Sequence, residues 1–353
     1  MRRPTIKDVA REAGCSLSTV SLVVNKRGYV SKETKQRVLR VVKALGYHPT
    51  RSARGLASKT SGNIGFVLRE DHFSHAEPFY TRVFLGAEFA ASQAGFYLLL
   101  TTIGYDFGER DELPRFLLER NVDGLIVAGK VSQPFMSKAA RSGIPIVLVD
   151  FELKQKRFPA VLIDNRSGTR AAVTQLITDG HRKIAFVSGD ADHPSLAERF
   201  EGYRDALTEH GITIPTHFVD LRESDSRLAN GANAMGRLLH QEPRPTAVVA
   251  ANDAMAIGCM QEIARAGLSV PGDIAVAGFD DIEVSALMRP PLTTLRVFKE
   301  ELGRQAVETL VGILRSGNPT LVTKHVPVEL IVRESTAGMV PAELKHIDQD
   351  QIK

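Results

Sequence analysis

The sequence has no tryptophan, two cysteines and 6% aromatic residues, and each scarcity limits what the protein can be. Cys15 and Cys259 are far apart and lack Cys or His neighbours at ligand spacing, which argues against a disulfide framework and a zinc site. No apolar run approaches the ~18 residues of a membrane helix, and the N-terminus has no apolar signal-peptide core. We therefore expect a cytoplasmic protein without a membrane partner.

Acidic residues are scarce in one part of the chain only. Residues 1–60 hold 14 Lys and Arg and three acidic residues, a net charge of +11, whereas the whole chain of 353 residues has a net charge of +4. The remaining residues are therefore slightly acidic. A concentrated basic segment attracts polyphosphate, because each neutralised phosphate releases condensed counterions. The charge distribution favours nucleic-acid binding by the N-terminal segment, and the length allows two or three domains.

The basic segment has the hydrophobic periodicity of short helices. Thr5 and Asp8 fit a capping box before a helix at about 6–12, and Gly14 ends that helix. Ser16 can cap a second helix with Val20, Val23 and Val24 on its apolar face, and a third helix runs from about Ser31 to Gly46. Two short helices around a glycine-containing turn predict a helix-turn-helix.

Residues 61–340 alternate apolar strand-like runs with helical stretches, which predicts parallel sheets covered on both faces. Two such series suggest two doubly wound lobes with a cleft between them, at the carboxyl ends of the strands. Helices are expected at about 83–94, 109–120, 132–142, 166–179, 195–210 and 253–267. Polar residues at the predicted strand ends or in nearby loops make up the candidate binding groups: Asp150, Asp164, Asn165, Asp190, Asp192, His193, Ser195, Arg199, Asn252, Asp253, Asp280 and Asp281.

The sequence contains none of the common catalytic motifs. It lacks the phosphate-binding G-x-x-x-x-G-K-[ST], the dinucleotide-binding G-x-G-x-x-G, the hydrolase G-x-S-x-G and the metalloprotease H-E-x-x-H. Asp280 and Asp281 are adjacent carboxylates, but neighbours at a strand end point to opposite faces. We therefore expect a binding protein and no enzyme, with no cofactor, no metal and no catalytic residue.

The segment TIKDVAREAGCSLSTVSLVVNKRGYVSKETKQRVLRVVKALGYHPTRSARGLASKTSGNIGFV resembles the N-terminus of LacI/GalR (lactose-repressor family) transcriptional regulators. The resemblance continues to about Gly338 through GHRKIAFVSG, PTAVVAANDAMAIGCM and IAVAGFDD. It implies an all-α helix-turn-helix domain followed by an α/β, periplasmic-binding-protein-like effector domain. It also implies a homodimer that represses transcription from a pseudo-palindromic double-stranded DNA operator.

The resemblance assigns roles to residues of the basic segment. Leu17, Ser18 and Leu22 would face bases in the major groove, and Leu22 departs from the Arg or His that is frequent in the family. The segment at 49–60 resembles the family's hinge helix. Its candidate minor-groove contacts are Arg51, Arg54 and the wedge Leu56, whereas the bare residues also fit a flexible linker because Gly55 disfavours a helix. The candidate phosphate contacts are Thr5, Ser16, Thr19, Ser21 and Asn25.

The resemblance also implies a small-molecule effector, most simply a sugar or sugar derivative, with a purine or nucleoside as the alternative. The sign of regulation stays open between induction and co-repression, and an activator of the same architecture is the other alternative. The implied domains are 1–48, the hinge 49–60, the effector domain 61–340 and the tail 341–353, with lobe one at 61–162 plus 291–321 and lobe two at 163–290 plus 322–340. The implied effector contacts are Phe79, Tyr80, Asp150, Ser195, Arg199, Asn252 and Asp280.

Overall fold

A computed structural model describes residues 4–24, 28–47, 60–72, 79–153, 155, 157–190, 192–318 and 321–337. The first two ranges form three helices around a small apolar core that includes Val9, Val20, Val23 and Val38. Thr5 and Asp8 form the predicted capping box, and Gly46 ends the third helix in a left-handed conformation. The predicted helix-turn-helix is confirmed. The three helices are α1 (Ile6–Glu12), α2 (Leu17–Val24) and α3 (Lys32–Leu45).

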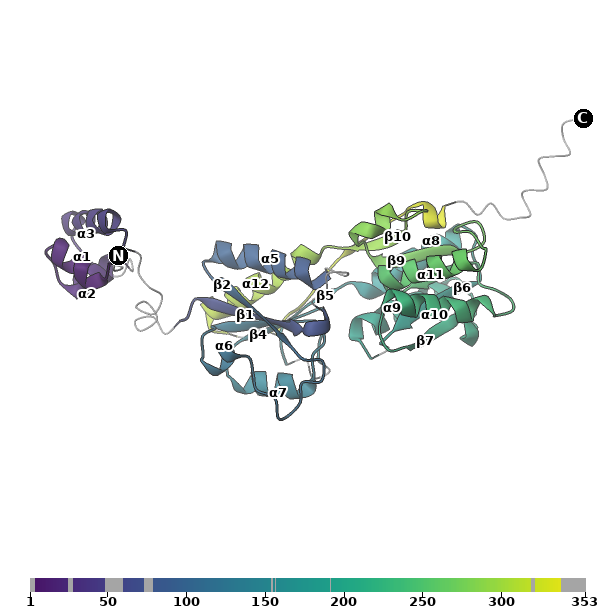
Figure 1. The fold of residues 1–353 in the computed structure, drawn as a ribbon, viewed down its shortest axis with the longest axis horizontal. Helices are drawn as coiled ribbons and strands as arrows, with labels where there is room; N and C mark the ends of the chain where they lie inside the picture. The colour runs from purple at the N-terminus through teal and green to yellow at the C-terminus, as the bar shows by residue number, and fades with distance from the viewer. Residues whose placement is uncertain are drawn as a thin grey trace, which may run out of the picture.

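The first sheet of the effector region has the strand order β11-β5-β4-β3-β1-β2, and all its pairs are parallel. Helices α5 and α12 cover one face, whereas α6 and α7 lie on the other (Figure 1). The strands are β1 (Asn63–Arg69), β2 (Tyr97–Ile103), β3 (Gly124–Ala128), β4 (Ile146–Val149), β5 (Ala160–Ile163) and β11 (Thr323–Val326). The helices are α5 (Phe79–Ala94), α6 (Arg115–Leu118), α7 (Gln133–Arg141) and α12 (Lys299–Ser316), with a 3-10 turn η1 at Glu70–His72.

The second sheet has the order β12-β10-β9-β8-β6-β7, with only β12 antiparallel to its neighbour. Helices α8 and α9 pack on one face and α10 and α11 on the other. The strands are β6 (Ile184–Gly189), β7 (Val219–Glu223), β8 (Ala247–Ala250), β9 (Ala275–Asp280), β10 (Thr293–Val297) and β12 (Val328–Ile331). The helices are α8 (Asn165–Thr178), α9 (Pro194–Glu209), α10 (Leu228–Leu239) and α11 (Asp253–Arg265), with 3-10 turns η2 (Thr216–Phe218), η3 (Glu283–Leu287) and η4 (Glu334–Thr336).

The two predicted doubly wound lobes are thus present, and we call the first sheet with its helices lobe one and the second lobe two. The described chain passes between them after β5, after β10 and after β11. In lobe one, α5 and α12 approach closely at two glycines. A Cβ at Gly86 would overlap the Glu300 carbonyl oxygen, and one at Gly303 would overlap that of Val83. Only glycine permits this contact between the helices.

Four details of the sequence-based description are wrong. The stretch 109–120 contains only the one-turn helix α6, and the unit formed by β7 and α10 was not anticipated. β10 belongs to lobe two although 291–321 was expected in lobe one, because β10 hydrogen-bonds to β9. β11 belongs to lobe one although 322–340 was expected in lobe two, because it hydrogen-bonds to β5. Apolar strand patterns do not reveal which sheet a strand joins.

Candidate functional site

The second helix of the N-terminal domain presents the side chains that were predicted to read bases. Leu17 and Leu22 are exposed for 45% and 38% of their surface, and Ser18 is exposed as well. Val20 and Val23, on the opposite face, hold the helix to the core. Leu17, Ser18 and Leu22 therefore lie on the side of α2 that points away from the core.

The predicted phosphate contacts that the structure describes take part in local hydrogen bonds. Thr5 Oγ1 accepts a hydrogen bond from Asp8 N at 3.4 Å, and Ser16 Oγ accepts one from Thr19 N at 3.1 Å, so Thr5 and Ser16 each cap a helix. Ser21 is half-buried on α2. The remaining predicted DNA contacts lie outside the described residues; these are Asn25, Arg51, Arg54 and Leu56.

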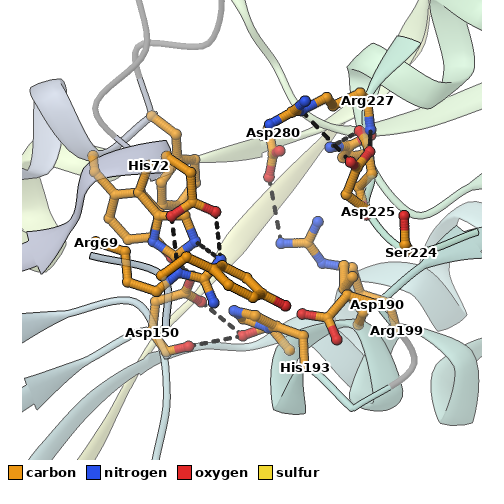
Figure 2. Close-up of a pocket in the computed structure, with 18 residues that line it drawn as sticks. Arg69, His72, Asp150, Asp190, His193, Arg199, Ser224, Asp225, Arg227 and Asp280 are labelled. Carbon is orange, nitrogen blue, oxygen red and sulfur yellow. Dashed lines mark hydrogen bonds and ion pairs between the residues drawn. The ribbon is translucent and has the colours of Figure 1, made fainter. Parts of the chain in front are cut away.

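A cavity of about 520 Å³ lies between the two lobes, at the carboxyl ends of their strands (Figure 2). Every residue that was predicted to contact an effector lines it. Lobe one supplies Phe79, Tyr80 and Asp150, and lobe two supplies Ser195, Arg199, Asn252 and Asp280. The tertiary structure therefore brings together seven side chains that are spread over 202 positions of the sequence.

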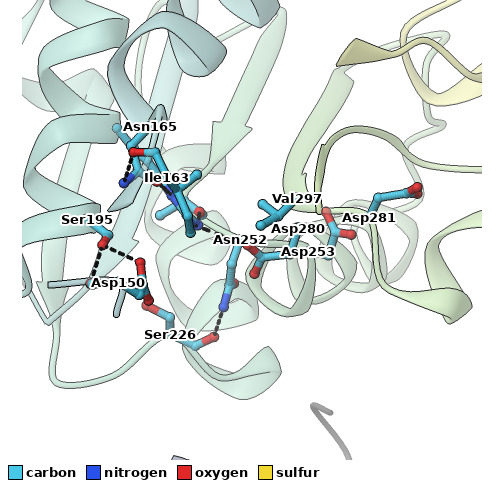
Figure 3. Close-up of polar contacts among 12 residues, drawn as sticks. Asp150, Ile163, Asn165, Ser195, Ser226, Asn252, Asp253, Asp280, Asp281 and Val297 are labelled. Atoms are coloured by element: carbon cyan, nitrogen blue, oxygen red, sulfur yellow. Dashed lines mark hydrogen bonds and ion pairs between the residues drawn. The ribbon is translucent and has the colours of Figure 1, made fainter. Parts of the chain in front are cut away.

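Asp150 connects the two lobes. It follows β4 in lobe one, and its Oδ2 accepts a hydrogen bond from Tyr80 Oη at 2.7 Å. Its Oδ1 accepts one from Ser195 Oγ of lobe two, also at 2.7 Å (Figure 3). Burial and the neighbouring Asp150 carboxylate raise the pKa of Tyr80 well above its usual value. Tyr80 thus stays a hydrogen-bond donor at physiological pH.

Arg199 is the central cation of lobe two. Its Nε donates to Asn165 Oδ1 at 2.8 Å, one terminal nitrogen donates to the Ala251 carbonyl at 2.6 Å, and the other lies 3.3 Å from Asp280 Oδ1. The guanidinium also stacks 3.6 Å from the centre of the Phe279 ring. These contacts fix the guanidinium before any ligand arrives.

Asp280 ends β9 and faces the cleft, whereas Asp281 faces away. Burial raises the pKa of the Asp280 carboxyl, even though Arg199 and Lys299 lower it. Asp281 accepts hydrogen bonds from Arg296 and Arg333 at 2.7 Å each. The two carboxylates therefore have different partners and point in different directions. The sequence analysis predicted this arrangement, in which they cannot share a proton as an acid–base dyad.

Three aspartates that line the cleft hold a backbone conformation that disfavours ordinary residues. The φ angles are +64° at Asp150, +36° at Asp190 and +111° at Asp280, in the region that glycine adopts most readily. Such conformations cost of order 1–3 kcal/mol and persist where the surrounding structure enforces them, frequently at ligand sites. Asp150 follows β4 of lobe one, whereas Asp190 follows β6 and Asp280 ends β9, both in lobe two.

The end of β1 and the η1 turn contribute Arg69 and His72 to the cavity lining, and Tyr105 lies beside Arg69. The sequence analysis did not predict these contacts. Arg69 makes a bidentate pair with Asp71 at 2.7 and 2.9 Å and lies 4.5 Å from the Tyr105 ring centre. His72 stacks on Tyr80 with ring centres 4.8 Å apart, and burial lowers its pKa to about 4. His72 is therefore neutral at pH 7.

The sequence reasoning also missed the residues between β7 and α10, because it missed that unit. Asn252, the cap of α11, donates from Nδ2 to the Ser226 carbonyl at 3.0 Å and so links this loop to the next strand end (Figure 3). Arg69 could have been found, since it is the polar residue at the end of the first apolar strand. The lining residues that were not singled out are Arg69, Asp71, Tyr105, Leu196, Ser224, Asp225, Ser226 and Arg227.

A helix-turn-helix followed by two lobes around a polar cleft defines a ligand-responsive DNA-binding regulator. A profile described as "Bacterial regulatory proteins, lacI family" matches residues 5–50, and one described as "Periplasmic binding protein-like domain" matches residues 173–336. The HTH-type transcriptional repressor PurR of Photobacterium profundum is 34% identical over 95% of this chain and 99% of its own length. The ribose operon repressor of Escherichia coli (strain K12) is 35% identical over 94% and 98%.

Two solved structures are also similar to this chain over nearly its whole length. A transcriptional regulator CelR–cellobiose complex covers 94% of this chain and 100% of its own, with 33% identity and a TM-score of 0.73. A lac repressor dimer bound to operator and the anti-inducer ONPF covers 95% and 99%, with 29% identity and a TM-score of 0.79. The chain belongs to the LacI family of bacterial regulatory proteins and is a DNA-binding transcriptional regulator. Within the described residues, no helix has the length and apolarity to cross a membrane.

Proposed function

We propose that this protein is a cytoplasmic, homodimeric repressor whose affinity for a pseudo-palindromic operator changes when a carbohydrate occupies the cleft between its lobes. The observation that carries the proposal is the cleft itself, because side chains of both lobes meet there. Asp150 of lobe one and Ser195 of lobe two are already hydrogen-bonded at 2.7 Å. A ligand that changes this contact would change the angle between the lobes, with a coupling energy of about 1–3 kcal/mol.

The N-terminal domain would supply the DNA contacts. Leu17, Ser18 and Leu22 form an exposed strip on α2 that suits the major groove. Because leucine offers only apolar contact, Leu22 would favour a thymine methyl group at its base pair. Protein symmetry would require a nearly two-fold symmetric operator.

An apolar surface on lobe one supports the homodimer. Phe89 and Leu85 are exposed for 65% and 43% on one side of α5, and Leu100 is exposed on the α5 side of the edge strand β2. We call these three residues the α5–β2 patch. A second copy of the chain would shield both the patch and the open strand edge from water.

The bound carbohydrate would lie between the aromatic rings of lobe one and the polar groups of lobe two. Phe79 and Tyr80 offer ring faces, and Arg199, Asn252 and Asp280 offer donors and acceptors for hydroxyl groups. A purine or nucleoside is the second candidate, since the same rings could stack on a base. No catalytic role is proposed.

The test is operator binding of the purified full-length chain, measured by fluorescence anisotropy with DNA from its own promoter. Sugars and purines would be screened first by thermal unfolding, because a ligand at ~100 times its dissociation constant stabilises the native state by about 2.7 kcal/mol. A stabilising sugar that also shifts the operator dissociation constant supports the proposal. Stabilisation without any change in operator binding would contradict it, as would promoter DNA that binds no better than random DNA.

A further inference from the structure

Residues 61–63, at the start of the effector domain, form a turn that one carboxylate holds. Asp123 Oδ1 accepts a hydrogen bond from Ser61 N at 2.6 Å, and Asp123 Oδ2 accepts one from Gly62 N at 2.8 Å. Gly62 has a φ angle of +67°, which glycine adopts readily, and Asn63 N donates back to Ser61 Oγ at 3.1 Å. Successive backbone N–H groups in a tight turn can form a concave anion site. We call the two bonds to the carboxylate the Asp123 clamp.

Further hydrogen bonds attach the same turn to the first sheet. Asn63 Nδ2 donates to the carbonyl oxygen of Asn121 at 2.8 Å and to its Oδ1 at 3.1 Å. Asp123 N donates to the Asn63 carbonyl at 2.8 Å, and Tyr97 N donates to the Gly62 carbonyl at 3.1 Å. Asn63 begins β1, Tyr97 begins β2 and Asp123 directly precedes β3, and these three strands are neighbours in the sheet. The turn is therefore fixed to the amino ends of three adjacent strands.

Two of these strands run from the turn to the cleft. β1 has seven residues and ends at Arg69, which lines the cavity. β3 ends shortly before Lys130, which donates to the Asp192 carbonyl of lobe two at 3.0 Å. A strand rises about 3.3 Å per residue, so the Asp123 clamp lies about 20 Å from the cleft. All five residues of β3 are buried, and close-packed interiors transmit displacements because they are hardly compressible. The turn and this wall of the cleft therefore move as one body.

The turn is also where the chain arrives from the helix-turn-helix. Residues 48–59 connect the two domains in the sequence and lie outside the described residues. A connection whose end is fixed to lobe one passes a displacement of the lobe on to the DNA-binding domain. A loose end would absorb that displacement, because Ser61 and Gly62 would regain free backbone torsions whose ordering has to be repeated on DNA binding.

We propose that Asp123 is a positioning residue for DNA binding. Its carboxylate fixes the end of the connecting segment to lobe one, so that the position of the lobe determines where the helix-turn-helix can bind. Hydrogen bonds from backbone N–H groups to an ionised carboxylate are stronger than those between neutral groups, which suits this task. This inference rests on the proposed function and names a contact through which its regulation passes.

The experiment compares Asp123→Asn with the wild type in the full-length chain. Asparagine has nearly the same size, but its amide nitrogen cannot accept the second backbone hydrogen bond. Fluorescence anisotropy gives the dissociation constants for DNA from the protein's own promoter and for a random duplex. Titration at DNA concentrations far above the dissociation constant gives the active fraction, which separates unfolding from a loss of affinity. We expect promoter affinity of the active fraction to fall by about tenfold and random-duplex affinity to stay within about twofold.

Asp111→Asn is the matched control. Asp111 also lies in a loop of lobe one, and its Oδ2 accepts a hydrogen bond from Gly108 N at 2.7 Å. This loop follows the carboxyl end of β2, whereas the Asp123 clamp lies at the amino ends of the strands. Both DNA affinities of the control should stay within about twofold of the wild type. Hydrogen exchange measured by mass spectrometry should become faster in peptides that contain Ser61 and Gly62 for Asp123→Asn and should not change for Asp111→Asn.

Asn63→Ala is the second variant, for use if Asp123→Asn has no active fraction. It removes the bonds to Asn121 and should lower promoter affinity in the same direction but by a smaller factor. A folded Asp123→Asn protein that binds the promoter as tightly as Asp111→Asn does overturns the inference. An equal loss on promoter and random DNA also overturns it, because the clamp would then not act on specific binding.

Promoter binding by the wild type separates the inference from the proposed function. If the wild type binds its promoter specifically and Asp123→Asn does so equally well, only the inference about the clamp is wrong. If the wild type binds promoter DNA no better than random DNA, the proposed function is wrong and the inference falls with it.

Discussion

Ser195 Oγ donates a 2.7 Å hydrogen bond to Asp150 Oδ1, and this bond joins α9 of lobe two to the end of β4 in lobe one. The same hydroxyl lies 3.0 Å from the Asp150 carbonyl oxygen. Nearby, Lys130 of lobe one donates to the Asp192 carbonyl of lobe two at 3.0 Å. The two lobes are thus in direct polar contact at the mouth of the cleft. A ligand must compete with or rearrange these contacts.

Ser195→Ala should weaken this contact. A buried carboxylate oxygen left without its donor costs about 1–3 kcal/mol, so the free energy of unfolding should fall by that amount. The ligand-free operator affinity should also change, because the lobes are less tightly joined. Denaturant unfolding and anisotropy measure the two effects. Ser92→Ala, on the exposed side of α5, is the control and should change stability by less than about 0.5 kcal/mol. Identical behaviour of the two variants would refute a role for the bond.

Arg199→Ala should abolish the effect of ligand on operator binding while basal operator binding is retained. The substitution leaves Asp280 buried without its cation, which costs about 3–5 kcal/mol and could unfold the protein. The double variant Arg199→Met/Asp280→Asn removes both charges and should recover most of that stability. Operator titrations with and without ligand are the measurement. A double variant that still responds to ligand would remove Arg199 from the binding site.

Asp253 should make stability depend on pH. Burial is the largest cause that raises its pKa, to about 7, and the Asp280 charge adds to it, although Ser285, Thr294 and the Ile282 backbone donate hydrogen bonds. A carboxyl with a raised native pKa binds its proton more tightly when folded. Its contribution to stability is therefore largest below the unfolded pKa of 3.8 and is lost as pH rises towards 7.

Asp253→Asn should remove this contribution. The difference in unfolding free energy between variant and wild type should shift in favour of the variant as pH rises from about 4 to 7. The free energy of the wild type must be subtracted from that of the variant at each pH, because His72 also makes stability depend on pH. Its native pKa is about 4, so its titration increases stability as pH rises, opposite to the effect of Asp253. Denaturant unfolding at a series of pH values supplies the data. Parallel pH profiles would show that Asp253 is ionised throughout.

Leu56→Ala tests the hinge segment, which lies outside the described residues. If Leu56 wedges between central base steps, its loss should weaken specific operator binding by an order of magnitude or more, while random DNA is bound nearly as before. Competition between operator and random duplexes in the same anisotropy assay gives both constants. Equal losses on the two DNAs would mean that Leu56 belongs to a simple linker.

Phe89→Glu tests the α5–β2 patch as the dimer surface. A charge at the centre of an apolar interface should raise the monomer fraction in analytical ultracentrifugation at micromolar concentration. Leu118→Glu is the matched control, since Leu118 is 56% exposed on α6, which covers the opposite face of the first sheet from α5. A Phe89→Glu protein that sediments like the control would move the dimer interface elsewhere.

Local signals explain which elements the sequence could predict. α1, α2 and α3 begin at Thr5, Ser16 and Ser31 because these side chains accept hydrogen bonds from the first turn, and such caps are visible in the sequence. β7 was missed because the apolar Val219 and Leu221 alternate with polar residues, so the strand gives no continuous apolar run. α10 begins at Leu228 without a side-chain cap.

The candidate cleft residues could be found because strand ends of parallel sheets meet at one edge. That rule selected Asp150, Asn252 and Asp280, and all three line the cavity. It could not reveal that Asp150 is already bound by donors of both lobes, because Tyr80 and Ser195 are 70 and 45 positions away in the chain.

The helix-turn-helix, the alternation of strands and helices and the types of polar groups at the cleft could be read from the chain, because caps, hydrophobic period and strand ends act over a few residues. Packing in three dimensions places β10 and β11 in opposite sheets and lets Asp150 link the lobes. These features depend on which distant segments pack together, and that choice minimises the free energy of the whole chain.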